Sequence, residues 1–360
     1  NTYLEYRIGK MYQYGLGTDE NMEQAGEWFS KAAAKEHKYA LYSLGMLYLQ
    51  GKGVEQDEET AYSLLFRSYS KGNPYAAYEL GKLYEAGCGT EKNQEKSENC
   101  YRVAFLGFLN LEKRSKDDTL WYRIGCMYLH GIGTEADETK AEHYLTKASD
   151  YGNTHASYQL ARLYIRQESQ KLSGESGTAP DYAKIAKAVK WLEESAAQEN
   201  PFADYAIGRL YREGTLVAED MEKAVFHLKR AADAGNSYAQ YQLGKIYLEE
   251  DTRNIPAAIQ YLTLAAKQKN EFAAYRLGKL YLTGEELPKN TELALHYLKM
   301  AADTENQYAQ YALGKVYLIG KDVQQDKELA YDYFLKSAEQ GNIYAAYFLE
   351  HWNDMPHPDL

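Results

Sequence analysis

Apolar and polar residues follow two helical patterns along this chain, and the two patterns recur together. The first is seen in Ala239–Glu249, which has the order Ala-x-Tyr-x-Leu-Gly-Lys-apolar-Tyr. The second starts sixteen residues after that glycine and places apolar residues at i, i+3, i+4 and i+7, as in Ala141, Tyr144, Leu145 and Ala148. This spacing is typical of an amphipathic helix. Each unit is therefore predicted to contain two helices.

The copies align on the glycine of the first helix, which we call the anchor. Six of the nine steps between anchors are 36 residues long, and the others are 44, 47 and 34. A near-fixed period of this size is typical of a solenoid, whose units bury their apolar faces against one another. We therefore expect one all-α superhelical solenoid over residues 1–360, with about nine helix–turn–helix repeats and a C-terminal half-repeat cap. The anchors are Gly9, Gly45, Gly81, Gly125, Ala161, Gly208, Gly244, Gly278, Gly314 and Glu350.

Turn and cap residues predict where the helices end and begin. A glycine six residues after the anchor is expected to end the first helix in a left-handed conformation. Four residues before each second apolar pattern lies an Asn or Asp whose side chain can cap the helix start. The glycines are Gly15, Gly51, Gly87, Gly131, Gly214, Gly284 and Gly320, and the caps are Asn21, Asp57, Asn93, Asp137, Asp220, Asn254, Asn290 and Asp326.

Three steps depart from 36 residues. The 44-residue step predicts a longer second helix or connection around residues 105–120. The 47-residue step arises from Glu168–Asp181, a polar Gly/Ser/Pro segment that we expect to be a mobile surface loop. The 34-residue step predicts a shorter turn near Glu249–Asn254. Residues 352–360 are expected to form a short C-terminal tail.

The repeated motif Ala-x-Tyr-x-Leu-Gly-x-x-Tyr-x-x-Gly, followed by Asp/Asn-x-x-x-Ala, resembles the Sel1-like repeat family, a relative of the tetratricopeptide repeats. The resemblance covers essentially the whole chain. It implies a right-handed α/α superhelix with first helices on the concave side and a role as an adaptor between proteins. One secreted branch of the family carries a disulfide in each repeat, and this chain lacks those cysteine pairs. The tyrosine-rich motif also looks like repeats attached to larger bacterial proteins such as plasmid mobilisation relaxases.

Composition narrows the function classes. The formal net charge of −11 argues against a generally basic nucleic-acid binder. Cys88, Cys100 and Cys126 form no CxxC pair, so they indicate neither a disulfide framework nor a metal site. The sequence has no run of about 18 apolar residues that would span a membrane. Because the first residues already belong to a repeat, the chain is expected to be cytoplasmic, and either processed or part of a larger protein.

The sequence contains only weak matches to phosphate-binding, metal-binding or catalytic motifs. GxG pairs occur at Gly15/Gly17, Gly51/Gly53, Gly87/Gly89 and Gly131/Gly133, but they follow helices instead of strands and lack the rest of a phosphate-binding motif. His143, His227 and His296 lie on second helices of different units, and the sequence contains neither HExxH nor GxSxG. We therefore expect no catalytic residues, no metal and no cofactor.

Two tyrosine columns recur in the first helices. The column three residues after the anchor falls on the apolar side of the helix and is predicted to be core packing. The column three residues before the anchor is complete in all ten copies and points about 120° away, toward the border of the polar face. The two columns are Tyr12, Tyr48, Tyr84, Tyr128, Tyr164, Tyr211, Tyr247, Tyr281 and Tyr317, and Tyr6, Tyr42, Tyr78, Tyr122, Tyr158, Tyr205, Tyr241, Tyr275, Tyr311 and Tyr347.

A cation follows the anchor in seven of ten copies, one helical turn from the second tyrosine column. The seven are Lys10, Lys82, Arg162, Arg209, Lys245, Lys279 and Lys315. Such a surface could bind an acidic or aromatic peptide, because Tyr offers rigid contact area and cations steer anions. The alternative is a solvated face on which each cation covers its Tyr and pairs with a carboxylate. The candidate groove comprises Tyr78, Lys82, Tyr158, Arg162, Tyr205, Arg209, Tyr241, Lys245, Tyr275, Lys279, Tyr311 and Lys315.

The sequence thus predicts a noncatalytic scaffold that binds a protein or peptide partner, with an acidic partner among the candidates, through this groove. One alternative is a nucleic-acid-binding or interaction region of a larger bacterial DNA-processing protein, which the cations favour and the net charge opposes. The other is a hydrolase, which only scattered carboxylates suggest. Neither the partner nor the oligomeric state follows from the sequence.

Overall fold

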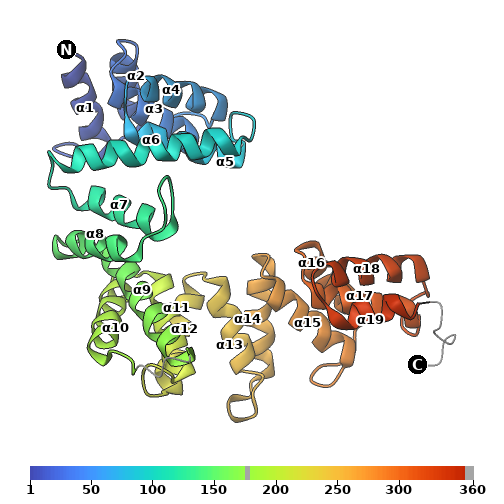
Figure 1. Cartoon of the computed structure of the whole chain (residues 1–360). Coiled ribbons are helices and arrows are strands. Elements are labelled where there is room, and N and C mark those ends of the chain that lie inside the picture. Colours follow the sequence, from blue (N-terminus) through green and yellow to red (C-terminus); the bar gives the residue numbers. More distant parts are fainter. Residues whose placement is uncertain (175–178, 353–360) are drawn as a thin grey trace. The chain divides into compact units, whose positions relative to one another are not determined.

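The computed structural model describes residues 1–174 and 179–352, and within these ranges the chain is helical with no strands (Figure 1). One short 3-10 helix, η1, covers Glu250–Thr252. The α-helices are α1 Thr2–Tyr14, α2 Met22–Ala33, α3 Lys38–Gln50, α4 Glu58–Ser70, α5 Pro74–Ala86, α6 Gln94–Glu112, α7 Asp118–His130, α8 Glu138–Asp150, α9 Thr154–Ser173, α10 Tyr182–Ala197, α11 Pro201–Glu213, α12 Met221–Asp233, α13 Ser237–Ile246, α14 Ile255–Lys267, α15 Glu271–Thr283, α16 Thr291–Asp303, α17 Gln307–Ile319, α18 Lys327–Glu339 and α19 Ile343–Glu350.

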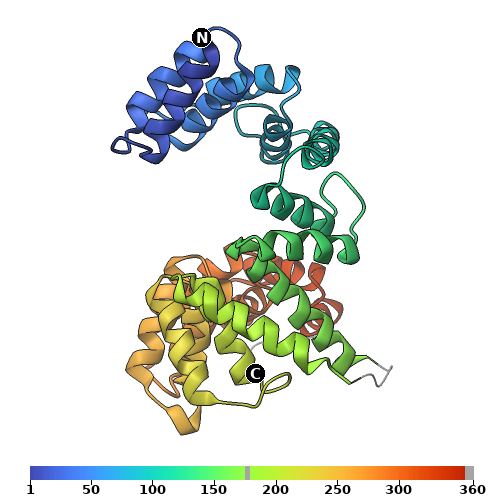
Figure 2. The same cartoon turned by 90° about the vertical axis from the view of Figure 1, so that its left-hand side faces the viewer.

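The contacts divide the chain into two compact units, Asn1–Leu163 (unit 1) and Tyr164–Leu360 (unit 2). Within each unit, a first helix packs on the second helix of its own repeat, and that second helix packs on the first helix of the next repeat (Figures 1 and 2). This arrangement confirms the predicted all-α repeat architecture. The single solenoid over residues 1–360 remains a prediction.

The anchor glycines lie where the two helices of a repeat come closest. A Cβ on Gly244 would be 2.5 Å from Leu262 Cγ of α14, and a Cβ on Gly45 would be 3.0 Å from Leu65 Cγ of α4. Both distances are too short for a side chain without a shift of the partner helix. Glycine at the anchor therefore permits this close approach, although Ala161 occupies the same position in α9.

The predicted turns and caps are present. The seven turn glycines adopt φ angles between 60° and 77°, which is the left-handed region. The eight predicted cap residues each accept a hydrogen bond from a backbone N–H in the first turn of the second helix. In the GxG pairs, a Cβ on Gly53, Gly89 or Gly133 would overlap backbone atoms of a preceding second helix. These glycines therefore serve helix packing.

One of two irregular steps has the predicted origin. Helix α6 has 19 residues, so the 44-residue step comes from a longer second helix. The 34-residue step was expected to come from a shorter turn, but it comes from a shorter first helix. Helix α13 has only 10 residues, and the connection over residues 247–254, which contains η1, is no shorter than residues 284–290 between α15 and α16.

The expectation of a loop over Glu168–Asp181 is wrong at its start. Helix α9 continues to Ser173, so the first six residues of that segment are helical. The sequence between Glu168 and Ser173 is polar but contains neither Gly nor Pro, so nothing in it ends the helix. Residues 175–178, where the mobile loop was expected, lie outside the described residues.

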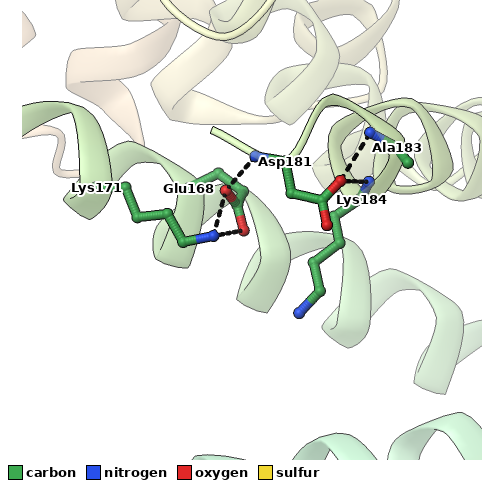
Figure 3. A network of polar contacts seen from close by, with 5 residues as sticks. All are labelled: Glu168, Lys171, Asp181, Ala183 and Lys184. Carbon is green, nitrogen blue, oxygen red and sulfur yellow. Dashed lines mark hydrogen bonds and ion pairs between the residues drawn. The ribbon is translucent and has the colours of Figure 1, made fainter. Parts of the chain in front are cut away.

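A buried carboxylate holds the two ends of this segment together (Figure 3). The Glu168 side chain is 0 % exposed, and it accepts hydrogen bonds from the Asp181 backbone N–H at 2.7 Å and from Lys171 Nζ at 2.8 Å. Burial raises the pKa of Glu168, but these two donors outweigh it and lower the pKa overall. Asp181 in turn caps α10 through the N–H groups of Ala183 and Lys184.

The described chain ends with a packed aromatic residue. The Trp352 ring lies 5.2 Å from the Tyr331 ring and 6.1 Å from the Phe334 ring, measured between centroids. The tail predicted over residues 352–360 therefore begins at least one residue later. Residues 353–360 lie outside the described part of the chain.

Candidate functional site

The tyrosines three residues after the anchor are packing residues, as predicted. None of them is exposed, and Tyr84, Tyr128, Tyr164 and Tyr317 are buried. The Tyr317 ring stacks on Tyr333 of α18 with centroids 6.1 Å apart. Burial of these rings stabilises the contact between first and second helices.

The tyrosines three residues before the anchor lie at the border of the polar face. Nine of the ten are half-buried, and Tyr347 is exposed. Desolvation raises the pKa of Tyr6, Tyr42 and Tyr122 to about 12, and it also raises the pKa of Tyr241. These hydroxyls are thus protonated at neutral pH.

A third aromatic column, which the sequence reasoning missed, lies six residues before the anchor. Four of these rings in unit 2 contact the half-buried tyrosine of the preceding first helix: Tyr238 contacts Tyr205, Phe272 contacts Tyr241, Tyr308 contacts Tyr275 and Tyr344 contacts Tyr311. Tyr238, Phe272 and Tyr308 remain 55 %, 44 % and 52 % exposed. The signal was present in the sequence as an aromatic residue or His at this position in nine of ten copies, with only Thr119 departing.

Six of the seven cations after the anchor lie over the tyrosine one turn before them. Lys245 Nζ is 5.7 Å from the Tyr241 ring centroid and Lys315 Nζ is 5.9 Å from the Tyr311 ring centroid. The same contact is made by Lys10 with Tyr6, Lys82 with Tyr78, Arg162 with Tyr158 and Arg209 with Tyr205. A cation over a ring face is attracted by about 0.5–1 kcal/mol at an exposed site.

These cations differ in whether a carboxylate neutralises them. Lys82 Nζ lies 2.9 Å from Glu79 Oε2, and an Arg209 guanidinium nitrogen lies 2.6 Å from Glu213 Oε1. Lys245, Lys279 and Lys315 form no ion pair with any residue that the structure describes. Among the described residues, the expected pairing of cations with carboxylates therefore holds for Lys82 and Arg209, and it fails for these three lysines as well as for Lys10 and Arg162.

The exposed rings and unpaired cations gather on the first helices α13, α15 and α17. We call this set the α13–α17 face; it consists of Tyr238, Lys245, Phe272, Arg276, Lys279, Tyr308 and Lys315. Burial lowers the pKa of Lys245. The neighbouring cations Arg212 and Arg276 lower it further, whereas Glu249 raises it. Desolvation is thus the main cause of the lowered pKa of Lys245, and the nearby cations add to it.

A cavity of about 490 Å³ lies between α15 and α17 on this face. Its apolar wall comes mainly from Leu282, Leu298, Ala312, Val316 and Ile319. Tyr275, Lys279, Tyr311 and Lys315 line the same cavity, so four of the twelve predicted groove residues meet there.

The other predicted groove residues occupy the expected helix positions but share no cavity with these four. Tyr78 and Lys82 lie on α5 and Tyr158 and Arg162 lie on α9, all in unit 1. Tyr205 and Arg209 lie on α11, and Tyr241 and Lys245 lie on α13, both in unit 2. A groove running through all twelve residues stays a prediction.

Other polar groups form packing contacts. His227 Nδ1 of α12 lies 2.8 Å from Asp204 Oδ1 of α11, and an Arg230 nitrogen lies 3.5 Å from the same oxygen. The three cysteines are free thiols. Over residues 1–174 and 179–352, no group of three or more His, Cys, Asp or Glu side chains is placed to hold a metal ion. No helix in these ranges is long and apolar enough to cross a membrane.

Comparison with known proteins agrees with the repeat register. The family model of the Sel1 repeat matches nine segments, residues 3–37, 38–73, 74–105, 122–153, 154–200, 201–236, 237–270, 272–303 and 307–342. A comparison with curated proteins found no match.

Two solved structures share the fold. The protective antigen c5321 of uropathogenic Escherichia coli, which displays an SLR fold, is 24 % identical with a TM-score of 0.57, over 99 % of this chain and 81 % of that one. A Sel1 repeat protein from Oxalobacter formigenes is 24 % identical with a TM-score of 0.56, over 91 % of this chain and 89 % of that one. With nine matched repeats and an all-helical fold, the chain belongs to the Sel1 repeat family.

Proposed function

We propose that this protein is a noncatalytic scaffold that binds a protein or peptide partner on the exposed face of its first helices, centred on the α13–α17 face. Sel1 repeat proteins generally mediate protein–protein interactions. The observation that carries the proposal is the combination of three exposed aromatic rings with unpaired cations on adjacent helices. Aromatic rings supply much of the binding energy of an interface, and unpaired cations attract an acidic partner.

Two features of this face lower the free-energy cost of binding a ligand. Each exposed ring already rests on a half-buried tyrosine, so its orientation is restricted before a partner arrives. A restricted ring loses little conformational entropy on binding. Lys279 and Lys315 have no carboxylate to displace, so a partner's carboxylates meet them without breaking an internal ion pair.

Position-specific cross-linking tests the proposal. A photoreactive phenylalanine analogue replaces Tyr308 in one variant and Phe226 of α12 in another; the native side chains are 52 % and 57 % exposed. In extract of the cells that make this protein, we expect one defined protein to cross-link at position 308 but not at position 226. Reversing Lys245, Lys279 and Lys315 to Glu is expected to remove that product.

Two results would overturn the proposal. One is equal cross-linking of the same protein at positions 308 and 226. The other is a product at position 308 that disappears on nuclease treatment, which would make nucleic acid the ligand.

A further inference from the structure

The residue two positions before the anchor differs among the helices of the α13–α17 face. It is Gln242 in α13, Arg276 in α15 and Ala312 in α17. Ala312 is half-buried and lines the cavity between α15 and α17. Because its side chain is a single methyl group, it leaves open the space that Gln or Arg would occupy.

The cavity joins an apolar wall to a cationic rim. Leu282 and Leu298 contribute to the wall, and Lys279, Lys315 and Lys321 lie at the rim. The one carboxylate in the lining, Asp322, is 2.6 Å from Lys289 Nζ and is thus neutralised already. A volume of about 490 Å³ falls in the range of roughly 300–1,000 Å³ that small-ligand pockets have, so it is large enough to admit a side chain of any size.

Resting on the proposed function above, we infer that this cavity takes one aliphatic or aromatic side chain of an extended peptide whose adjacent residues are Asp or Glu. The apolar wall stabilises the inserted side chain by removing its surface from water. The rim lysines bind the flanking carboxylates, which an uncharged apolar segment would not offer. The α15–α17 cavity then determines which peptide sequences bind. The other cations and rings of the α13–α17 face attract acidic peptides without distinguishing among their sequences.

A selection from short random peptides displayed on phage tests this assignment with the intact chain. The pocket variant Ala312→Gln carries the residue that α13 has at the equivalent position, so the fold tolerates it. The matched control Ala206→Gln makes the same change in α11, outside the residues that line this cavity. A third variant, Lys279→Glu with Lys315→Glu, reverses the rim and leaves the wall intact. Circular dichroism verifies that each variant folds.

We expect the wild-type chain and Ala206→Gln to select peptides with one large apolar residue between Asp or Glu residues. The Ala312→Gln variant is expected to select acidic peptides without that apolar residue, and to bind the best wild-type peptide at least about ten-fold more weakly. The rim variant is expected to lose the acidic peptides altogether.

Different failures point to different errors. If Ala312→Gln binds the wild-type peptides unchanged while the rim variant loses them, the cavity assignment is wrong and the proposed binding face stands. If the wild-type chain selects no acidic peptide, or if the rim variant binds the same peptides equally well, both proposals are wrong.

Discussion

The first helices α3, α5 and α7 of unit 1 and α13, α15 and α17 of unit 2 share one scaffold but present different surfaces. In α3, α5 and α7 the position after the anchor holds Met46, Lys82 and Cys126, so these three helices carry a single cation there, and Glu79 neutralises it. In unit 2 the same position holds three unpaired lysines.

The aromatic rings differ in the same way. Tyr39 and Tyr75 of unit 1 are half-buried, and the third copy at this position is Thr119. The Arg123 guanidinium lies 5.6 Å from the Tyr75 ring centroid and 5.7 Å from that of Tyr78, so these two rings already contact a cation of the same unit. The corresponding rings of unit 2 are exposed. The repeat period therefore determines the fold, and a few surface residues determine which first helices can bind a partner.

The largest expected effect tests the aromatic part of this contrast. Tyr308→Ala is expected to speed dissociation of the cross-linked partner about 30-fold, which corresponds to about 2 kcal/mol, because aromatic anchors dominate interface energies. Tyr39→Ala, at the equivalent position of unit 1, is expected to leave the dissociation rate unchanged. Surface plasmon resonance measures both. Equal changes in the dissociation rate for the two substitutions would contradict the proposed difference between the first helices of unit 1 and unit 2.

The next prediction tests what the two regions share. Gly244→Leu and Gly45→Leu are each expected to destabilise the chain by about 1–3 kcal/mol through overpacking. The Gly244 change should cost more, since the distance to its neighbour is 2.5 Å against 3.0 Å for Gly45. Urea unfolding measures the loss, with Gln260→Leu on the exposed side of α14 as control. An unchanged midpoint for either glycine variant would contradict the shared packing.

A smaller loss is expected at Glu168, outside both faces. Glu168→Ala removes the acceptor of the Asp181 N–H and should destabilise by about 1–2 kcal/mol. Leu172→Ala, at an exposed position of the same helix, should be nearly neutral. Thermal unfolding compares them, and the association and dissociation rates of the partner should be the same in both. A change in binding would show that the α13–α17 face does not act independently of this segment.

The smallest effect is a pH dependence common to both regions. Burial raises the pKa of Tyr42 to about 12, whereas an unfolded tyrosine titrates near 10. The unfolded state therefore loses its proton first, so this contribution to stability is complete below about pH 10 and is lost as pH rises toward about 12. Burial also raises the pKa of Tyr275 in unit 2.

Tyr42→Phe and Tyr275→Phe keep the ring and remove the ionisable hydroxyl. Each variant is expected to lose less stability than the wild type across this pH window, as measured by urea unfolding at a series of alkaline pH values. A loss equal to that of the wild type would show that these hydroxyls are not desolvated.

The repeat period predicted nearly all of the fold because glycine turns, Asn/Asp caps and the 3.6-residue periodicity are local signals. The extension of α9 to Ser173 was missed because the polar residues after Glu168 were read as part of the loop, although none of residues 168–173 is Gly or Pro; the contact of Glu168 with the Asp181 N–H, thirteen residues away, was not readable from the sequence. For the site, the helix positions of the tyrosines and cations were predictable. The i,i+3 pairing of Glu79 with Lys82 was also readable from the sequence.

The remainder of the site depends on tertiary contacts. The cavity arises only where Ala312 of α17 faces Leu282 of α15 and Leu298 of α16. The ion pair of Lys289 with Asp322 joins residues 33 positions apart, and it neutralises the carboxylate that lines the cavity. No local pattern reports such a pairing.

Charge reversal with a salt series tests the binding face most directly. The association rate of the cross-linked partner is measured at low, physiological and high salt for the wild type, for Lys245→Glu/Lys279→Glu/Lys315→Glu and for the second-helix control Lys229→Glu/Lys267→Glu/Lys336→Glu. The first-helix reversal is expected to slow association at least about ten-fold at low salt and to abolish its salt dependence, because long-range attraction acts on the encounter. The control should retain both the rate and its salt dependence. Equal slowing by the two sets would contradict binding on the α13–α17 face.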